Sequence, residues 1–488
     1  MQQRNPTSTQ RTTAVAIALA TLLLVAVTGC GSTLYEAQAA FKAGDMRAAE
    51  TLITGYAKRN RRSEHRVIAH IELGSIMFEA GRYSDSARAF QYAEDELLAI
   101  DRAPPPSLTE ALETTLKNPA EATYLGTPAE RVMSATMLGL AYCMLGDFDA
   151  ARPSFRSAGF WQEDGIVRHR NRIDEAQRLA ESDAQGSALL ESVESASRRY
   201  EDSFFVGYES VSNSFSDVVQ GAFLLGQLAG SSDATDAEFL FGRASAVHPA
   251  NEYAAADAAI AASIGSSPPD RTYVLYAAGF SPFIIESLFA LPVPGVGIVT
   301  AAFPLLVPDR TRSPGPLTVE ADGVAFTTEL VADMDRIVGA DFNADLPVIT
   351  RRHVAAILAR NSIAVGTRVA GRRIEGIGGA LLQLAGLAYN IWQNKADLRS
   401  WRSLPKRFMY ASFPTPPSGV ITIASPPLGA ERIEVSPTGV NMVYIRALRP
   451  GVPPTVASFR VGRAGAEATA SAVGIDPGPL DTRKGSDR

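Results

Sequence analysis

Cysteine and histidine are scarce in this chain of 488 residues, which has two cysteines, Cys30 and Cys143, and five histidines. None of the histidines stands at a metal-ligand spacing from a cysteine or from another histidine, so the sequence gives no sign of a metal site. Cys143 lies in an apolar stretch of helical period, where we expect a buried and unreactive free thiol. We therefore expect neither a metal nor another cofactor.

Motifs of the common enzyme classes are absent as well. The sequence has no Gly-x-Ser-x-Gly segment and no P-loop lysine, and the glycines in 376–379 lack the spacing and the acidic partner of a dinucleotide-binding loop. Asp333 and Asp335 are neighbouring carboxylates, but they stand on an amphipathic segment where exposure to solvent is expected. The sequence predicts no catalytic residues, and it leaves open a dyad assembled from distant positions.

An excess of basic residues is missing too. The chain carries 46 Lys and Arg against 52 Asp and Glu, a net charge of −6, which gives no electrostatic footprint for nucleic acid. Its 46% hydrophobic and 20% charged residues are typical of a globular protein. The length predicts roughly two to four domains with sizeable cores.

The first 30 residues have the parts of an export signal. Arg4 and Arg11 precede an uncharged apolar run at 14–27, which is short for a membrane span of about 20 residues. The closing residues, Val-Thr-Gly-Cys at 27–30, resemble a bacterial lipobox, in which cleavage before the cysteine leaves it as a diacylated N-terminus. We expect a lipoprotein signal peptide at 1–29 and lipid attachment, palmitate included, at Cys30. An ordinary signal peptide or an uncleaved anchor helix is the alternative.

The residue after the cysteine bears on the location of the protein. Gly31, and not an aspartate, follows Cys30, which by analogy with lipoprotein sorting favours the outer membrane, with the protein facing the periplasm. Acyl chains contribute about 0.8 kcal/mol per buried CH₂, so they hold a protein firmly to a bilayer. The first expected partner is therefore a membrane, contacted through Cys30.

A short pattern recurs along the N-terminal half. Its clearest copy has Gly139, a turn at Gly146 and Phe155 at the spacings of a tetratricopeptide repeat, in which small residues let two antiparallel helices approach closely. The other copies are placed by their small and aromatic positions: Gly74, Gly81 and Phe90 in the second, Phe41, Gly44 and Ile53 in the first, and Gly226, Ala237 and Phe241 in an irregular fourth. Four copies predict a helical array.

The C-terminal half has a different residue pattern. After Pro268-Pro269, residues 272–276 predict a strand, and Asp322-Gly323 predicts the turn of a hairpin within 317–326. Two helices are expected at 348–360 and 377–395, and the uncharged run 376–392 favours a core helix over one that dips into a membrane. Strands alternating with prolines over 408–459 predict a small antiparallel β unit.

These patterns predict an α+β protein, in which a TPR-like helical array precedes a mixed α/β module with a small antiparallel β unit. The expected divisions are a signal peptide at 1–29, the helical array at 30–265 with an insertion at about 100–128, the α/β domain at 266–462, and a disordered polar tail at 463–488.

The chain resembles a little-characterised family of bacterial lipoproteins with a TPR-like N-terminal half and an α/β C-terminal half. The most specific likeness is the segment 396–405, Ala-Asp-Leu-Arg-Ser-Trp-Arg-Ser-Leu-Pro, with prolines at 414 and 417 before a strand. Further likeness lies in 142–147 and in the strand and turn at 273–282. The resemblance spans most of the mature chain, and it implies an architecture but no catalytic residues.

Asp397, Arg399 and Trp401 are the candidate partner-binding residues. An aspartate and an arginine beside a tryptophan have the composition of a binding hot spot. The alternative interpretation is a helix-to-strand junction, in which Asp397 caps or pairs locally and Trp401 fills the core.

Taken together, the sequence predicts a lipid-anchored scaffold or protein-interaction protein of the cell envelope, without catalysis and with an envelope protein as partner. The array offers a concave surface to that partner, or it supports the second domain. One alternative is an envelope hydrolase or transferase with a site near Asp397, Arg399 and the apolar region 280–307. Another is an accessory component of surface-polymer or lipoprotein export machinery.

Overall fold

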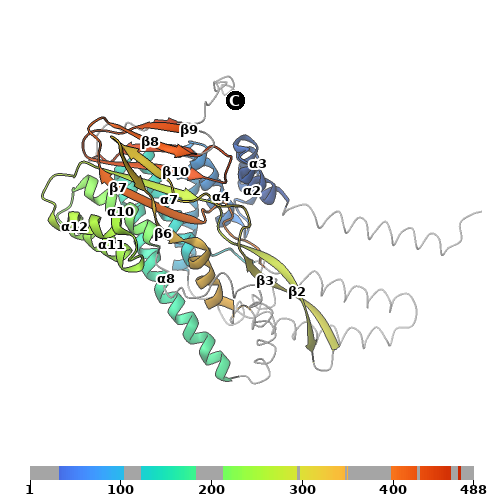
Figure 1. Ribbon diagram of the computed structural model, residues 1–488. Helices are drawn as coiled ribbons and strands as arrows, with labels where there is room; N and C mark the ends of the chain where they lie inside the picture. The colour runs from blue at the N-terminus through green and yellow to red at the C-terminus, as the bar shows by residue number, and fades with distance from the viewer. Residues whose placement is uncertain are drawn as a thin grey trace, which may run out of the picture.

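The helices of the N-terminal half pack as antiparallel pairs beside the sheets of the C-terminal half (Figure 1). The computed structural model describes residues 32–103, 122–182, 213–293, 297–346, 349, 397–425, 429–462 and 471–473. The pairs are α2 (Ser32–Ala43) with α3 (Met46–Asn60), α4 (Arg66–Glu79) with α5 (Tyr83–Arg102), α7 (Pro128–Met144) with α8 (Phe148–Ser182), and α10 (Ser214–Gln227) with α11 (Asp233–Val247), against which α12 (Glu252–Ser263) packs.

Glycine permits both the turns and the close approach within these pairs. The turns of the first three pairs place Gly44, Gly81 and Gly146 at φ of 85°, 72° and 74°, in the left-handed region that glycine adopts without strain. A Cβ atom added to Gly74 would lie 2.8 Å from the ring of Phe90, and one added to Gly139 would lie 2.4 Å from the ring of Phe155. The packing roles predicted for these glycines are confirmed.

The fourth pair departs from the predicted alignment. The ring of Phe241 packs on Gly221, where an added Cβ would lie 2.8 Å away. Gly226 faces the C-terminal sheet, and its Cβ would lie 2.5 Å from Val461 and 3.1 Å from Val440. Gly226, the glycine of the irregular fourth copy, therefore does not take the place that Gly139 has against Phe155, because Gly221 and Gly226 lie on different faces of α10.

Two sheets are stacked on the helices. The six-stranded sheet has the order β12-β11-β10-β1-β7-β6, and β1 pairs with β10 in the parallel direction while its other pairs are antiparallel. Its strands are β1 (Arg271–Ala278), β6 (Glu329–Asp333), β7 (Arg407–Pro414), β10 (Val440–Ala447), β11 (Thr455–Arg460) and β12 (Ser471–Val473). β12 falls inside the segment for which a disordered tail was expected.

The second sheet is the small antiparallel unit, with the order β5-β4-β8-β9. Its strands are β4 (Thr318–Ala321), β5 (Val324–Thr327), β8 (Val420–Ser425) and β9 (Gly429–Glu434). Asp322 and Gly323 form the predicted hairpin turn, with φ of 47° and 82°. Because β4 and β5 come from an earlier stretch of the chain, 408–459 alone does not form the unit.

The six-stranded sheet is covered on both faces, so its central strands are apolar throughout. In β1, Tyr273 and Leu275 join the core shared with the helices, while Val274 and Tyr276 join the core shared with the four-stranded sheet. This alternation follows from the opposite directions of successive side chains in a strand. The predicted strand at 272–276 is thereby confirmed.

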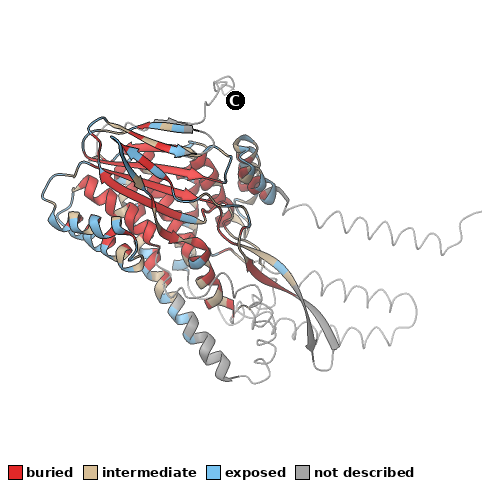
Figure 2. Ribbon diagram, in the orientation of Figure 1, coloured by how far each residue is buried: buried red, intermediate tan, exposed pale blue. Residues whose placement is uncertain are grey.

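The inner helices α4, α7 and α10 lie between their partner helices and this sheet, and almost all of their residues are buried (Figure 2). Phe78 of α4 meets Tyr444 edge to face at 5.2 Å, and Phe215 of α10 stacks on Phe408 at 4.1 Å. The two predicted domains therefore share one continuous core. The chain folds back on the helical array, and the sheet occupies the inner face of that array.

A two-stranded hairpin of β2 (Phe283–Val293) and β3 (Gly297–Val307) extends from this body (Figure 1). Residues 334–346 are helical, and Phe342 and Leu346 pack on Leu306 of the hairpin. The signal peptide, most of the insertion, and the helices expected at 348–360 and 377–395 lie outside the described residues, apart from Ile349, which is helical. Within the described part of the chain, no helix is both long and apolar enough to cross a bilayer.

Candidate functional site

The segment 397–404 crosses the inner helices instead of facing solvent. The carboxylate of Asp397 binds the guanidinium of Arg399, whose Nη2 donates to Oδ2 at 2.6 Å. Arg399 also donates from Nη1 to the carbonyl of Glu64 at 3.1 Å and lies 5.2 Å over the ring of Tyr124. The pair thus joins the last part of the chain to the loop before α4.

Trp401 fills the core at the centre of this crossing. Only 2% of its surface is exposed, its ring lies 5.9 Å from that of Phe90, and its Nε1 donates to Ser403 Oγ at 2.8 Å. Its backbone amide donates to Oε1 of Glu130 at 2.7 Å. This is the geometry of the junction interpretation, and the Trp401 side chain presents almost no surface to a partner.

Buried carboxylates on the inner helices hold the C-terminal half. Glu72 accepts from the amide of Arg402 at 2.7 Å, and Glu79 accepts from the hydroxyl of Tyr444 at 2.9 Å. Burial raises the pKa of Glu72, Glu79 and Glu130, although hydrogen bonds to each of them act in the opposite direction. Each donor offsets part of the cost of burying a carboxylate. Replacing one of these acids would therefore leave several buried hydrogen-bond donors without an acceptor.

Asp257 of α12 is another buried carboxylate that bonds to the C-terminal half, and it makes the stability of the protein depend on pH. Burial raises its pKa to about 6, although the Nε of Arg271 at 2.7 Å and the hydroxyl of Ser412 at 2.7 Å lower it. Because this value lies above that of an unfolded aspartate, the folded state binds the proton more tightly. Its contribution to stability is complete below about pH 4 and is lost as the pH rises through about 6.

When the pH is lowered from 7.5 to 5, we expect the free energy of unfolding of the native chain to rise by about 1 kcal/mol more than that of Asp257→Asn. The variant is the control because it retains the other buried acids, whose pKa values are shifted in the same direction. Urea unfolding followed by circular dichroism at several pH values measures the difference. Parallel pH curves for the two proteins would contradict this assignment.

The described residues offer little for catalysis or metal binding. No group of three or more His, Cys, Asp or Glu among them is placed to hold a metal ion. Cys143 is a buried free cysteine, as expected, and burial raises the pKa of its thiol well above the ordinary value. Phe280, in the apolar region 280–307 near which the hydrolase alternative placed its site, is packed in the core.

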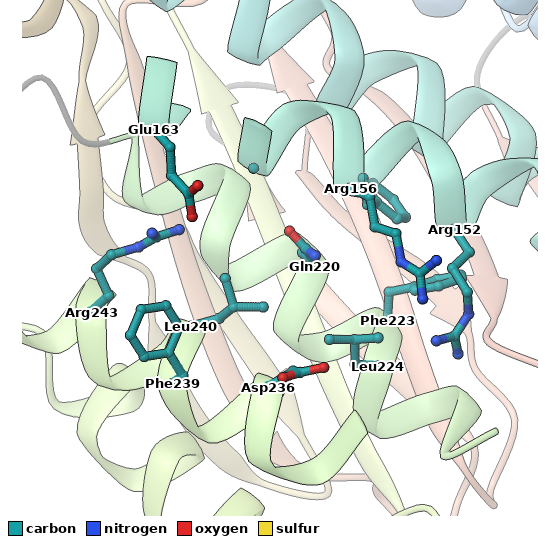
Figure 3. Close-up of a pocket in the computed structure, with 12 residues that line it drawn as sticks. Arg152, Arg156, Glu163, Gln220, Phe223, Leu224, Asp236, Phe239, Leu240 and Arg243 are labelled. Atoms are coloured by element: carbon teal, nitrogen blue, oxygen red, sulfur yellow. The ribbon is translucent and has the colours of Figure 1, made fainter. Parts of the chain in front are cut away.

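An open pocket lies on the helical array between α8 and α11, over α10 (Figure 3). Its volume is about 210 Å³. Phe155, Phe223 and Leu240 form apolar parts of its lining. Phe239 stands at the rim with 63% of its surface exposed, the largest fraction among the exposed large hydrophobic residues of the described chain.

Three arginines line the same pocket. Arg152 and Arg156 lie side by side on α8, and Arg243 lies across from them near Glu163 (Figure 3). Arg152 makes two bonds to Asp233, at 2.9 and 2.8 Å, and Arg243 Nε bonds to Asp217 at 2.9 Å.

Arg156 differs from the other two arginines of the pocket. It is exposed and makes no ion pair with any residue that the structure describes. The pocket therefore combines an apolar floor, an exposed aromatic rim and one guanidinium that has no ion pair within the described part of the chain.

Sequence reasoning did not find this pocket. Phe239 and Arg156 carry no motif, and the lining comes from three helices, of which α8 is separated from α10 and α11 along the chain by residues 183–212. An aromatic residue next to the buried position Leu240 is the only signal, since it falls outside the apolar stripe of α11.

No family model, no curated protein and no solved structure matches the chain.

Proposed function

We propose that this protein is a lipid-anchored interaction protein of the bacterial cell envelope, without catalysis, whose helical array binds a partner through its outer pocket. The observation that carries this proposal is that the inner face of the array holds the protein's own sheet. Helical arrays of this kind commonly bind peptides on such a face. The pocket of α8, α10 and α11 is a recess of the array that the sheet does not fill.

The pocket favours a protein segment with an apolar side chain beside a carboxylate. The floor of Phe155, Phe223 and Leu240 suits an apolar group, and exposed Phe239 adds an aromatic contact at the rim. Arg156 supplies a guanidinium, which binds carboxylates through paired hydrogen bonds. Attachment through Cys30 and a location in the envelope rest on the N-terminal sequence.

Phe239→Ala together with Arg156→Glu is expected to reduce labelling of the partner at least about fivefold, because aromatic and arginine anchors dominate binding energy. Proximity labelling from the anchored full-length protein in its own cells, read by quantitative mass spectrometry, measures the change. Val324→Ala, which truncates an exposed apolar side chain on β5, is the matched control.

Two results would contradict the proposal. One is an unchanged set of labelled proteins in the double variant, and the other is an equal loss in Val324→Ala. The double variant should retain the native unfolding midpoint, since both changed side chains are exposed.

A further inference from the structure

The outer face of α8 carries a regular row of exposed residues, which we call the α8 stripe. The exposed positions of this helix from 148 to 168, followed by the next one at 170, are Asp149, Pro153, Arg156, Phe160, Glu163, Val167 and Arg170. Successive positions are four or three residues apart in alternation, which aligns their side chains along one side of a helix. At a rise of about 1.5 Å per residue, the stripe is about 30 Å long. α8 packs on α7 and α10 with its other faces, and it lies on the outside of the helical array (Figures 1 and 2).

Apolar residues recur along the α8 stripe at every seventh position. Phe160 and Val167 have 50% and 53% of their surfaces exposed, and Pro153 stands seven residues before Phe160. The ring of Phe160 lies 5.0 Å from that of Trp161, which is buried and donates from Nε1 to Glu94 at 2.8 Å. The exposed ring therefore rests on a fixed base. A seven-residue apolar spacing is typical of a helix that packs lengthwise on another helix.

The charges of the α8 stripe alternate in sign between these apolar positions. From 149 to 170 the order is negative, apolar, positive, apolar, negative, apolar, positive. In the reverse direction every charge is replaced by its opposite, while the apolar positions stay apolar. A second copy of the same helix, running antiparallel, is therefore complementary to the stripe over its whole length.

We propose that two copies of this chain associate through their α8 stripes, antiparallel about a two-fold axis that passes beside Phe160. Phe160 then packs on its counterpart, and Arg156 of each copy binds Glu163 of the other. Pro153 meets Val167 of the second copy in the same arrangement, because each is seven residues from Phe160. Closed two-fold contacts are the commonest form of homo-oligomer. A parallel arrangement in register would bring like charges together, so the charges also determine the direction of pairing.

The two charged residues nearest the axis are available for this contact. Arg156 makes no ion pair within the described part of the chain, and Glu163 makes none with a described residue, although it lies near Arg243 (Figure 3). The guanidinium of Arg243 is bonded to Asp217. Arg156 can therefore bind the carboxylate of the second copy through paired hydrogen bonds without the loss of an existing ion pair.

This contact goes beyond the proposed function and does not depend on it. Phe160 and Val167 lie outside the lining of the pocket, whereas Arg156 and Glu163 belong to that lining. A second copy and an envelope partner therefore use Arg156 in turn. Self-association keeps this arginine occupied until a partner displaces the second copy.

Charge reversal across the axis tests the arrangement in the full-length chain. Two versions with different tags are expressed together in the protein's own cells and extracted in mild detergent, and the recovery of one version with the other is measured. Native versions should co-purify. Arg156→Glu paired with itself, or Glu163→Arg paired with itself, should lower the recovery at least about fivefold, because like charges then face each other. Arg156→Glu in one version with Glu163→Arg in the other should restore it, because opposite charges again meet at both places.

A cysteine beside the axis locates the contact. Phe160→Cys lies opposite its own counterpart, so mild oxidation of the full-length chain in membranes should give a disulfide-linked dimer on a non-reducing gel. Val324→Cys, on β5, is the matched control, because Val324 is exposed to a similar extent, at 54%. The control also measures any background from Cys30, while Cys143 is buried.

The outcomes separate this proposal from its alternatives. Absence of both co-purification and the Phe160→Cys dimer overturns it, as does co-purification that survives both single reversals or that the mixed pair fails to restore. Loss of a different protein from the captured material in Phe160→Asp, with no self-pairing of the native chain, would assign the stripe to another partner and overturn it too. Phe160→Asp should abolish self-pairing without lowering the labelling of an envelope partner, since Phe160 does not line the pocket. Failure of self-association and failure of the proposed function are therefore distinguishable.

Discussion

Replacing Gly139 by alanine is expected to lower the free energy of unfolding by about 2 kcal/mol. The added Cβ would lie 2.4 Å from the buried ring of Phe155, closer than atoms pack. Phe155 is held between α7 and α10, where it also packs against Phe223 at 5.0 Å, so it cannot yield without displacing a second ring. Urea unfolding followed by circular dichroism measures the loss.

Gly242→Ala is the matched control, because it makes the same chemical change within another helix. Nothing lies within 4 Å of a Cβ added to Gly242. Alanine favours a helix over glycine by about 1 kcal/mol, so this variant should be slightly more stable than the native chain. A destabilisation of similar size in both variants would show that the close contact of Gly139 with Phe155 is not what makes glycine necessary there.

Replacing Trp401 by alanine is expected to cost about 4 kcal/mol, in the range of large-to-small changes in a core. The change removes a fully packed indole at the junction of the inner helices and the C-terminal half. It leaves a cavity beside Phe90, and it leaves Ser403 without the indole N–H that bonds to its hydroxyl. Unfolding midpoints and limited proteolysis measure the effect.

Trp401→Phe is the control for this change. It keeps an aromatic ring in the core and loses mainly the hydrogen bond to Ser403, so about 1 kcal/mol of destabilisation is expected. A binding role for Trp401 predicts the opposite result for the alanine variant, namely native stability with altered labelling of partners. The two interpretations of the segment that contains Asp397, Arg399 and Trp401 are thereby separated.

The sequence-based predictions that the structure confirms rest on local patterns of residues. Gly81 and Gly146 mark turns because only glycine adopts their conformation freely, and Gly74 and Gly139 mark the close approach of paired helices. Asp322-Gly323 defines a hairpin for the same local reason. These features depend on a few neighbouring residues, so a single sequence contains enough information to place them.

The remaining features could not be predicted from the sequence, because they depend on pairing between segments that are far apart in the chain. The alternation within 408–459 shows strands but not that β10 pairs with β1 while β8 pairs with β4, since register and neighbours depend on segments far away in the chain. The pattern of the fourth copy names Gly226, but Gly221 is equally small, and only packing shows that Gly221 is the one that meets Phe241. The pocket was missed because its lining converges from three helices.

The sequence by itself determined the α+β class, the turns and close contacts of the helical pairs, the hairpin turn at Asp322-Gly323 and the buried state of Cys143. Each follows from backbone conformation or apolar patterning over short distances along the chain. Only the tertiary structure decided that the sheet fills the inner face of the array and that Trp401 belongs to the core. These depend on contacts between residues hundreds of positions apart, such as the amide of Trp401 with Glu130, and short-range patterning contains no record of them.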